Sequence, residues 1–265
     1  MAELSDQRQP VVPAERRRLI VELLREQGSV SVATLEQRFG ISSMTARRDL
    51  ALLDESGYAR RTHGGAILPE LAGHEDSFQS RIDRDVQAKT RLASAVAGAL
   101  KPGETVFIDS SSSSYYVVRQ ILDLGMPMTL LTNSLPVMTL VGSAEHPQID
   151  LIGVGGSFRK LTQSFVGTET VRMIERYFVD RIVFSVKGIE PEGYLTDPDP
   201  LEAEVKRAMI GRARSVLLLA QGQKFNERGL NVVVPADRID VAYLTEAPSG
   251  GLRVLREAGV EVVAA

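Results

Sequence analysis

The chain contains no cysteine and only three histidines among its 265 residues. The absence of cysteine excludes disulfide bonds, thiolate zinc sites and a cysteine nucleophile. The histidines lie far apart, at positions 63, 74 and 146, which argues against a histidine metal centre. We therefore expect domains held together by apolar packing, with no bound metal and no cofactor.

Long hydrophobic runs are also missing. No apolar run approaches the roughly 18 residues of a membrane-spanning helix, and the first residues lack the apolar segment of a signal peptide. Hydrophobic residues make up 43% of the chain and charged residues 25%, as in ordinary globular domains. These features predict a cytoplasmic protein with no membrane partner, and its length suggests two domains of about 100 to 200 residues each.

No lysine occurs before Lys89, so the side-chain cations of the N-terminal part, histidine aside, are all arginines. Guanidinium groups suit bidentate contacts with phosphate and guanine. A GC-rich codon usage would favour arginine as well. The net charge of -3 argues against a protein that coats nucleic acid without selectivity.

Two short helices are expected at the N-terminus. Apolar residues recur at helical spacing from Leu19 to Leu24 and stop at Gly28, which is typical of a helix end. The second helix is expected over residues 32–39, with Ser31 as its N-cap and Gly40 at its end.

A third helix is expected to start at Ser43 as its N-cap and to end at Gly57. Arg47 and Arg48 lie in its first two turns, where a recognition helix meets base edges or phosphates. A pair of arginines is more often a solvated surface, but the spacing of the whole segment favours DNA contact. Asp49 is better suited to brace an arginine or to cap locally than to face phosphates, which would repel it. Three apolar residues share the buried face: Ala46, Leu50 and Leu53.

Residues 58–67 alternate weakly in hydrophobicity and turn at Gly64 and Gly65, as a two-stranded wing would. The segments T-x-R-R-D-L-x-x-L at 45–53 and R-x-H-G-G at 61–65 resemble the signature of the DeoR family of bacterial transcription regulators. The resemblance covers almost the whole chain. It implies a winged helix-turn-helix domain over residues 1–68 that binds double-stranded operator DNA, most often as a repressor.

The expected DNA-binding residues come from the first helix, the start of the third helix and the wing. In the first helix, Arg16 to Arg18 are expected to contact the operator. Arg47, Arg48 and Arg61 are the strongest candidates for direct contact, whereas His63 could be only a turn residue. The full set is Arg16, Arg17, Ser42, Ser43, Thr45, Arg47, Arg48, Arg60, Arg61, His63 and Gly64.

The second domain is expected over residues 81–265, after a linker at 69–80 that has glycine, proline and acidic residues without periodicity. A long helix is expected from Arg81 to Leu100. Short apolar runs then alternate with helical stretches, which predicts an α/β domain with a mostly parallel sheet. The expected strands cover residues 105–108, 128–131, 149–153, 181–186, 215–219 and 241–245.

Polar loops follow these strands and should converge beyond the carboxyl ends of a parallel sheet. Hydroxyls, backbone amides at helix starts and lysines bind phosphate, while Asp109 and Asn133 suit sugar hydroxyls. We therefore expect a phosphorylated sugar or polyol effector rather than a nicotinamide, because residues 153–156 lack the G-x-G-x-x-G spacing. The expected effector-binding residues are Asp109, Ser110, Ser111, Ser112, Ser113, Thr132, Asn133, Ser134, Gly155, Gly156, Lys187 and Lys224.

The DeoR resemblance implies that this domain has a sugar-phosphate isomerase-like fold retained as a sensor. Four family segments, D-x-G-T-T, T-N-S, G-G and S-K-F, correspond to Asp109 with residues 111–113, then to residues 132–134, 155–156 and 223–225. Two of them depart from the family pattern. Serines replace the glycine and threonines of the first segment, and Ala220-Gln221 replaces the acidic residue usual before the lysine.

Several alternatives stay open on the sequence alone. The serine run at 110–114 could be a flexible linker, although its place between a strand and a helix favours a ligand loop. Lys187 could equally reach solvent. Surface charge is the favoured interpretation of Glu202, Glu204 and Lys206.

The rival function is a sugar-phosphate isomerase-like enzyme with an accessory DNA-binding domain, in which Asp109, Glu204 and Lys224 would be the acid-base candidates. A winged helix has no use in such an enzyme, so we expect a regulator with no catalytic residues. A third possibility is a winged helix that contacts a protein instead of DNA. Paired half-sites predict a homodimer or homotetramer, with the sensor domain supplying the interface.

Overall fold

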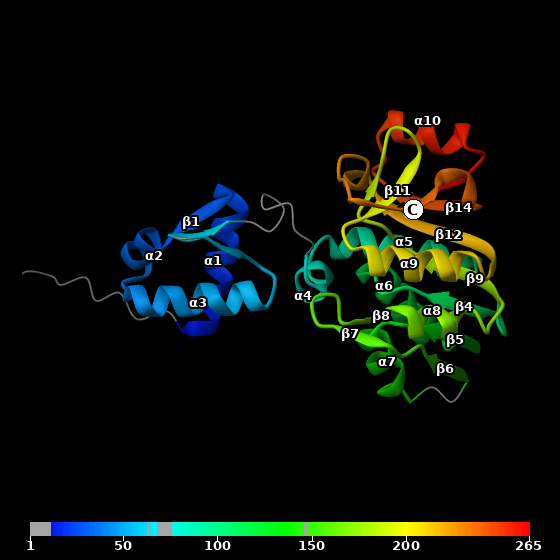
Figure 1. The fold of residues 1–265 in the computed structure, drawn as a ribbon, viewed down its shortest axis with the longest axis horizontal. Helices are drawn as coiled ribbons and strands as arrows, with labels where there is room; N and C mark the ends of the chain where they lie inside the picture. Colours follow the sequence, from blue (N-terminus) through cyan, green and yellow to red (C-terminus); the bar gives the residue numbers. More distant parts are fainter. Residues whose placement is uncertain (1–11, 63, 68–75, 146–147) are drawn as a thin grey trace, which may run out of the picture. The chain divides into compact units, whose positions relative to one another are not determined.

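The computed structural model describes residues 12–62, 64–67, 76–145 and 148–265 (Figure 1). The chain forms two compact units, one up to Ser80 and one from Arg81 onward. Every helix in the described ranges is too short or too polar to span a membrane.

The N-terminal unit combines three helices with a small antiparallel sheet, ordered β1-β3-β2. The sequence predicted the helices and the hairpin but missed β1, a three-residue strand that pairs with β3. Ser31 caps the second helix as expected. Ser42, and not Ser43, caps the third, because its side chain accepts the Thr45 amide at 3.2 Å. The elements are α1 (Pro13–Gln27), β1 (Ser29–Ser31), α2 (Val32–Phe39), α3 (Ser43–Glu55), β2 (Arg60–Thr62) and β3 (Gly65–Ile67).

Part of the segment expected to be a linker is structured. Ser77 Oγ donates to the Ser56 carbonyl at 2.5 Å, and Ser77 packs so closely on Gly57 that a Cβ there would lie 2.4 Å from the Ser77 Cβ. The Tyr58 hydroxyl donates to the Gln79 carbonyl at 3.2 Å. Residues 76–80 therefore pack on the winged helix, and residues 68–75 lie outside the described ranges.

The long helix expected from Arg81 is in fact two helices, α4 (Phe78–Ile82) and α5 (Val86–Ala99). Asp85 separates them because its left-handed backbone, with φ of 51°, cannot continue a helix. The buried ammonium of Lys89 donates to the carbonyls of Arg81 and Arg84, so two carbonyl groups at this break have a hydrogen-bond partner.

The C-terminal unit is built on a seven-stranded sheet in which every pairing is parallel, as predicted. Its order is β15-β14-β12-β9-β4-β5-β6, and the edge strand β15 was not predicted. The strands are β4 (Thr105–Ile108), β5 (Met128–Thr132), β6 (Ile149–Gly153), β9 (Val179–Phe184), β12 (Ala213–Gln221), β14 (Val241–Thr245) and β15 (Glu261–Ala264).

Two small antiparallel sheets flank the carboxyl end of this sheet. One joins β7 (Ser157–Arg159) to β8 (Ser164–Val166). The other has the order β10-β11-β13. Its strands are β10 (Gly188–Ile189), β11 (Tyr194–Asp197) and β13 (Asn231–Pro235), and short turns η2 (Gly222–Phe225) and η3 (Ala236–Arg238) border it.

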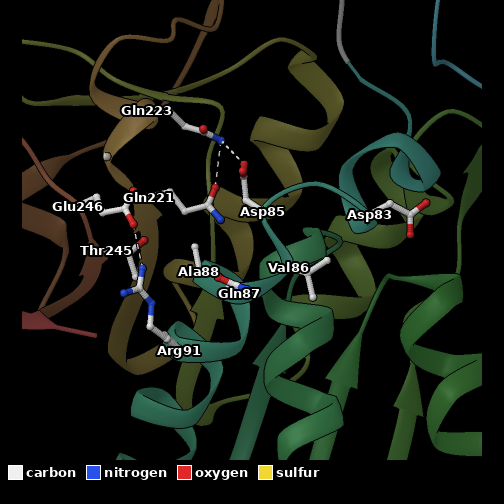
Figure 2. A pocket seen from close by; sticks show the side chains of 11 residues that line it. Asp83, Asp85, Val86, Gln87, Ala88, Arg91, Gln221, Gln223, Thr245 and Glu246 are labelled. Carbon is white, nitrogen blue, oxygen red and sulfur yellow. Dashed lines mark hydrogen bonds and ion pairs between the residues drawn. The ribbon is translucent and has the colours of Figure 1, made fainter. Parts of the chain in front are cut away.

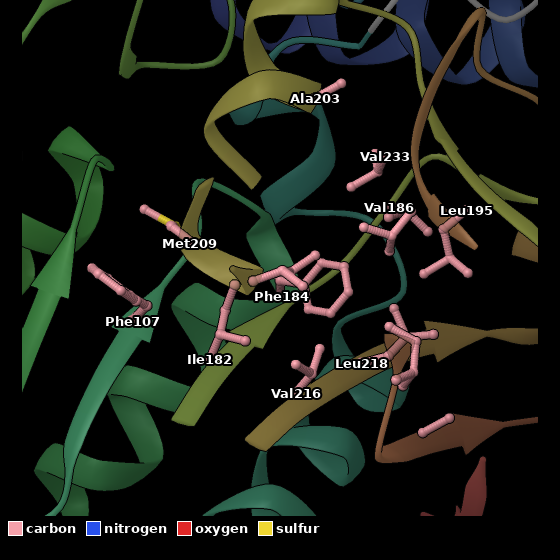
Figure 3. Packing of buried hydrophobic residues seen from close by; sticks show 14 of the residues in the cluster. Phe107, Ile182, Phe184, Val186, Leu195, Ala203, Met209, Val216, Leu218 and Val233 are labelled. Atoms are coloured by element: carbon pink, nitrogen blue, oxygen red, sulfur yellow. The ribbon is translucent and has the colours of Figure 1, made fainter. Parts of the chain in front are cut away.

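Helices cover both faces of the parallel sheet (Figure 1). Alternate strand residues such as Phe107, Ile182 and Phe184 pack on one face, where Met209 contributes to the same cluster (Figure 3). Their sequence neighbours pack on the other face. The first face carries α8 (Thr168–Ile174), α9 (Pro200–Ile210) and α10 (Ser249–Glu257), and the second carries α5, α6 (Ser112–Asp123) and α7 (Leu135–Gly142).

The strand order reverses direction between β4 and β9. From β4 the chain proceeds to β5 and β6 on one side, and from β9 to β12, β14 and β15 on the other. In open α/β sheets, ligands bind beyond the carboxyl ends of the strands at such a switch point. The loops after β4 and β9 therefore lie where such a sheet binds its ligand.

Candidate functional site

Helix α3 presents its first two turns to solvent. Ala46, Leu50 and Leu53 are buried, which leaves Arg47 and Arg48 exposed on the rest of its surface. The exposed hydroxyls of Ser42 and Ser43 precede the helix, and Thr45 is half-buried. The guanidinium groups are thus placed where they can contact phosphates or base edges.

Arg16 does not belong to this exposed surface. It is 7% exposed, and its Nε lies 2.6 Å from Asp49 Oδ2. Arg17 Nη1 lies 3.4 Å from Asp49 Oδ1, so both arginines tie α1 to α3. The predicted bracing role of Asp49 is confirmed. Arg16 was expected at the DNA-binding surface, but it is buried on Asp49 and has a structural role.

Arg18 is exposed on α1, but two carboxylates already engage its guanidinium. Glu15 and Glu22 lie 2.5 and 2.7 Å from it. This neutralised cation is therefore a weaker candidate for DNA contact than Arg47 and Arg48.

The wing consists of β2, β3 and the turn between them. Arg61 and Thr62 are exposed on β2, and the Arg61 amide donates to Asp54 Oδ1 at 3.3 Å, which fixes the wing against α3. Gly64 is exposed in the turn. Arg60 lies in β2, and His63 lies outside the described residues.

We expect Gly65→Ala to disrupt the wing and to reduce DNA binding at least about tenfold, since disruption of a strand pairing costs a few kcal/mol. A Cβ at Gly65 would lie 2.0 Å from the Val30 carbonyl oxygen, so β1 and β3 could not pair. Gly64→Ala is the matched control for the strand pairing, because nothing lies within 4 Å of a Cβ there. Hydrogen exchange of the β3 amides compares the two variants, and DNA affinity is measured for Gly65→Ala against the natural protein. Equal behaviour of the two would contradict the pairing argument.

The loop after β4 meets α9 at a buried ion cluster. Asp109, 1% exposed, accepts the backbone amides of Ser111 and Ser185 at 3.1 and 3.2 Å. Lys206 Nζ lies 3.4 Å from Asp109 Oδ2, contacts Asp197 Oδ2 and donates to the Ser185 carbonyl at 2.6 Å. Burial opposes the charge of Lys206, but Asp197 and Asp109 outweigh it and raise the pKa of this ammonium above its usual value.

A second buried carboxylate, Glu202, lies one turn earlier on α9. Its oxygens accept the hydroxyls of Ser110 at 2.9 Å, Thr162 at 2.7 Å and Ser164 at 2.5 Å. Asp199 caps α9 by accepting the Glu202 amide at 3.1 Å. Glu202 thus joins the serine loop after β4 to strand β8.

Two lysines from other loops share one carboxylate. Lys187 Nζ and Lys224 Nζ lie 3.3 and 3.5 Å from Glu227 Oε2. The Lys187 amide also donates to Asp197 Oδ1 at 2.7 Å, which connects this group to the Asp109 cluster. Burial lowers the pKa of Lys224 below its usual value, although Glu227 acts in the opposite direction.

The remaining expected segments are placed differently. Ser111 and Ser134 cap α6 and α7, and Asn133 Nδ2 donates to the Phe165 carbonyl at 2.9 Å while its buried Oδ1 has no protein partner. The Gly155 carbonyl accepts Thr170 Oγ1 on α8. A Cβ at Gly156 would lie 1.9 Å from that hydroxyl oxygen. We call the polar region formed by the loops after β4, β5 and β9, together with Lys224, the effector crevice.

Two family models match the chain. The DeoR-like helix-turn-helix domain matches residues 16–71, and the DeoR C terminal sensor domain matches residues 84–244. The chain belongs to the DeoR family of transcription regulators. Its N-terminal unit is therefore the DNA-binding domain of a DeoR regulator, and its α/β unit is the sensor.

Named relatives agree with this DeoR assignment. The putative aga operon transcriptional repressor of Escherichia coli O157:H7 is 30% identical over 253 residues, which cover 94% of this chain and 93% of the relative. The glycerol-3-phosphate regulon repressor of Escherichia coli (strain K12) is 31% identical over 234 residues, which cover 88% and 91%. Separately, a comparison with solved structures finds ribose 5-phosphate isomerase A from Methanocaldococcus jannaschii, with 14% identity and a TM-score of 0.39 over 53% of this chain and 55% of its own; this likeness does not bear on the family.

In this DeoR protein, α9 contributes two residues that sequence analysis favoured as surface charge. Glu202 and Lys206 are 3% and 6% exposed, whereas Glu204 is exposed, which removes Glu204 from the acid-base candidates of the crevice. The spacing of Glu202 and Lys206 gave no signal of their burial, because opposite charges four apart are typical of an exposed helix surface.

Proposed function

We propose that this DeoR regulator represses a sugar or polyol operon, and that a phosphorylated sugar or polyol in the effector crevice controls its affinity for operator DNA. One observation carries the effector proposal. Lys187 and Lys224 both lie within 3.5 Å of Glu227, beside a loop of hydroxyls at the switch point of the sheet. Ammonium groups together with hydroxyls are groups that bind a phosphate.

The crevice has a group for each part of such a ligand. The phosphate would lie near Lys224 and the start of α6, where Ser112 and Ser113 offer backbone amides at a helix N-terminus. The sugar hydroxyls would donate to the unpartnered Asn133 Oδ1. The relative from Escherichia coli K12 is named as a repressor of the glycerol-3-phosphate regulon, and glycerol 3-phosphate is a phosphorylated polyol.

DNA binding is assigned to the exposed part of the expected set. Arg47, Arg48 and Arg61 would contact phosphates or bases, supported by the hydroxyls of the α3 N-terminus. Arg16 is left out, because its guanidinium is buried on Asp49. A symmetric dimer or tetramer would place two α3 helices on paired half-sites, which multiplies the affinity of a single domain.

The enzyme alternative has less support. Asp109 and Glu202 are both held by hydrogen bonds from serines, threonines or backbone amides, and the ammonium of Lys206 stays paired with Asp109 and Asp197. A group fixed in this way does not exchange protons with a substrate readily. Turnover of a sugar phosphate by the full chain would contradict this assignment.

The test measures binding of the full chain to its operator at fixed salt, with and without sugar phosphates, since affinity without a stated salt concentration has no meaning. We expect Lys224→Met to bind operator normally but to need at least about tenfold more sugar phosphate for the same response, because one charged hydrogen bond is worth about 1.5–3 kcal/mol. Glu227 keeps Lys187 as its partner in this variant.

Lys101→Met is the matched control, because Lys101 is exposed just before the amino end of β4, opposite the crevice. It should respond like the natural protein. An unchanged response of Lys224→Met would remove Lys224 from the site.

A further inference from the structure

A second polar cavity, of about 420 Å³, lies at the carboxyl ends of β12 and β14, beside the start of α5 (Figure 2). Asp85 and Arg91 line it from the α5 side, and Gln221, Thr245 and Glu246 line it from the strand ends. None of its lining residues takes part in the contacts of Asp109, Glu202 or Lys224 described above. Its volume falls within the range of small-molecule sites, about 300–1,000 Å³. We call it the β12–β14 cavity.

Two buried side chains of this cavity have a polar atom without a protein partner. Gln221 is 7% exposed and Thr245 is 1% exposed, and within the described ranges neither Gln221 Nε2 nor Thr245 Oγ1 forms a hydrogen bond. The other amide atom of Gln221, Oε1, accepts Gln223 Nε2 at 3.0 Å, which leaves Nε2 as the free donor. A buried polar group without a partner is costly, so such groups point to a ligand or an ordered water.

The walls of the β12–β14 cavity are held in place by hydrogen bonds across it. Gln223 Nε2 also donates to Asp85 Oδ2 at 3.0 Å, and Arg91 Nη2 lies 3.0 Å from Glu246 Oε1. Figure 2 shows these side chains converging from α5 and from the strand ends. Asp85 and Glu246 both have left-handed backbones, with φ of 51° and 55°. Backbone strain of this kind is retained mainly at functional sites, so together with the two unpartnered atoms it supports a ligand site here.

The charge of the cavity restricts its ligand. Three carboxylates, those of Asp83, Asp85 and Glu246, line it against the single guanidinium of Arg91. That guanidinium is already paired with Glu246, so the lining does not offer a free cation to a phosphate. A hydroxyl group both accepts and donates, so it can accept from Gln221 Nε2 and donate to Asp85. We propose that the β12–β14 cavity binds an uncharged polyhydroxylated molecule, a free sugar or a free polyol, as a second ligand distinct from the phosphorylated effector.

The test uses the full chain and a panel of unphosphorylated pentoses, hexoses and acyclic polyols, each beside its phosphate ester. Calorimetry and thermal shift should detect the binding of at least one free sugar or polyol. Comparing the pentoses and hexoses with the acyclic polyols shows whether the ligand is cyclic or acyclic. Thr245→Val and Gln221→Met should each weaken this binding about tenfold, the effect of one hydrogen bond. Thr245→Val should fold, because it replaces an unpartnered hydroxyl with a methyl group of similar shape. Gln221→Met should also fold: it removes the acceptor Oε1 as well, but Gln223 Nε2 keeps Asp85 Oδ2 as a partner.

Lys224→Met serves as the control, since it removes a cation of the effector crevice and leaves the β12–β14 cavity intact. This variant should weaken the binding of the phosphate esters and leave the binding of the free sugar or polyol unchanged. The proposal is overturned if no unphosphorylated compound binds when it is present at about 10 mM, which is ten times a weak Kd of about 1 mM. It is also overturned if Thr245→Val leaves the binding unchanged. Failure of every phosphate ester would count against the proposed effector only, because the two ligand classes are measured separately.

Discussion

Replacing Lys206 with methionine should lower the free energy of unfolding of the sensor unit by about 3–5 kcal/mol, because it leaves two buried carboxylates without their cation. Lys206 contacts Asp197, lies 3.4 Å from Asp109 and donates to the Ser185 carbonyl, all in the interior. Tyrosine fluorescence during denaturant unfolding of the full chain reports this unit. Of the six tyrosines, only Tyr58 precedes Arg81.

Glu204→Gln is the control on the same helix, because Glu204 is exposed and its replacement should change the unfolding free energy by no more than about 0.5 kcal/mol. Adding Asp197→Asn to Lys206→Met should restore part of the stability by removing one uncompensated charge. Equal stability of Lys206→Met and the natural protein would show that solvent reaches the cluster.

The ion cluster also has a defined pH dependence. The pKa of Lys206 is raised in the folded state, so its contribution to stability is complete below the unfolded pKa. That contribution disappears only as the pH rises through the higher folded value. The cluster should therefore remain intact throughout the neutral range.

Much of the fold could be predicted from the sequence because its signals are local. A serine cap and a closing glycine bound α2 at Val32 and Phe39, and the apolar runs at 105–108 and 149–153 match β4 and β6. Strand β1 could not be predicted in this way. Three residues have no periodicity, and the pairing of Ser29–Ser31 with Gly65–Ile67 is a contact between distant segments.

The candidate site was predictable where position along the chain determines function. Asp109 and the serines follow a strand directly, and that alone places them at the carboxyl edge of a parallel sheet. Opposite charges four apart, as in Glu202 and Lys206, are typical of an exposed helix surface. Their burial depends on Ser110 and Asp109, which lie more than ninety residues away in the chain. Arg16 was misassigned for the same reason, since its partner Asp49 lies on another helix.

The double substitution Arg47→Ala with Arg48→Ala should weaken operator binding at least about 100-fold, because each specific arginine contact is worth about 1–3 kcal/mol. In a symmetric dimer each effect occurs twice. Both guanidinium groups are exposed on α3, so their removal leaves the packing of Ala46 and Leu50 unchanged. Fluorescence anisotropy with labelled operator measures the change in affinity at several salt concentrations.

The salt series separates the two ways in which an arginine can bind DNA. Removing an arginine from a phosphate should reduce the slope of log affinity against log salt by about 0.9, whereas removing one from a base edge should weaken operator binding and leave random DNA unchanged. Arg18→Ala is the matched control, because Glu15 and Glu22 already neutralise that guanidinium. If the double variant keeps full operator affinity with its fold intact, α3 does not bind DNA, and a protein partner for this helix becomes the better hypothesis.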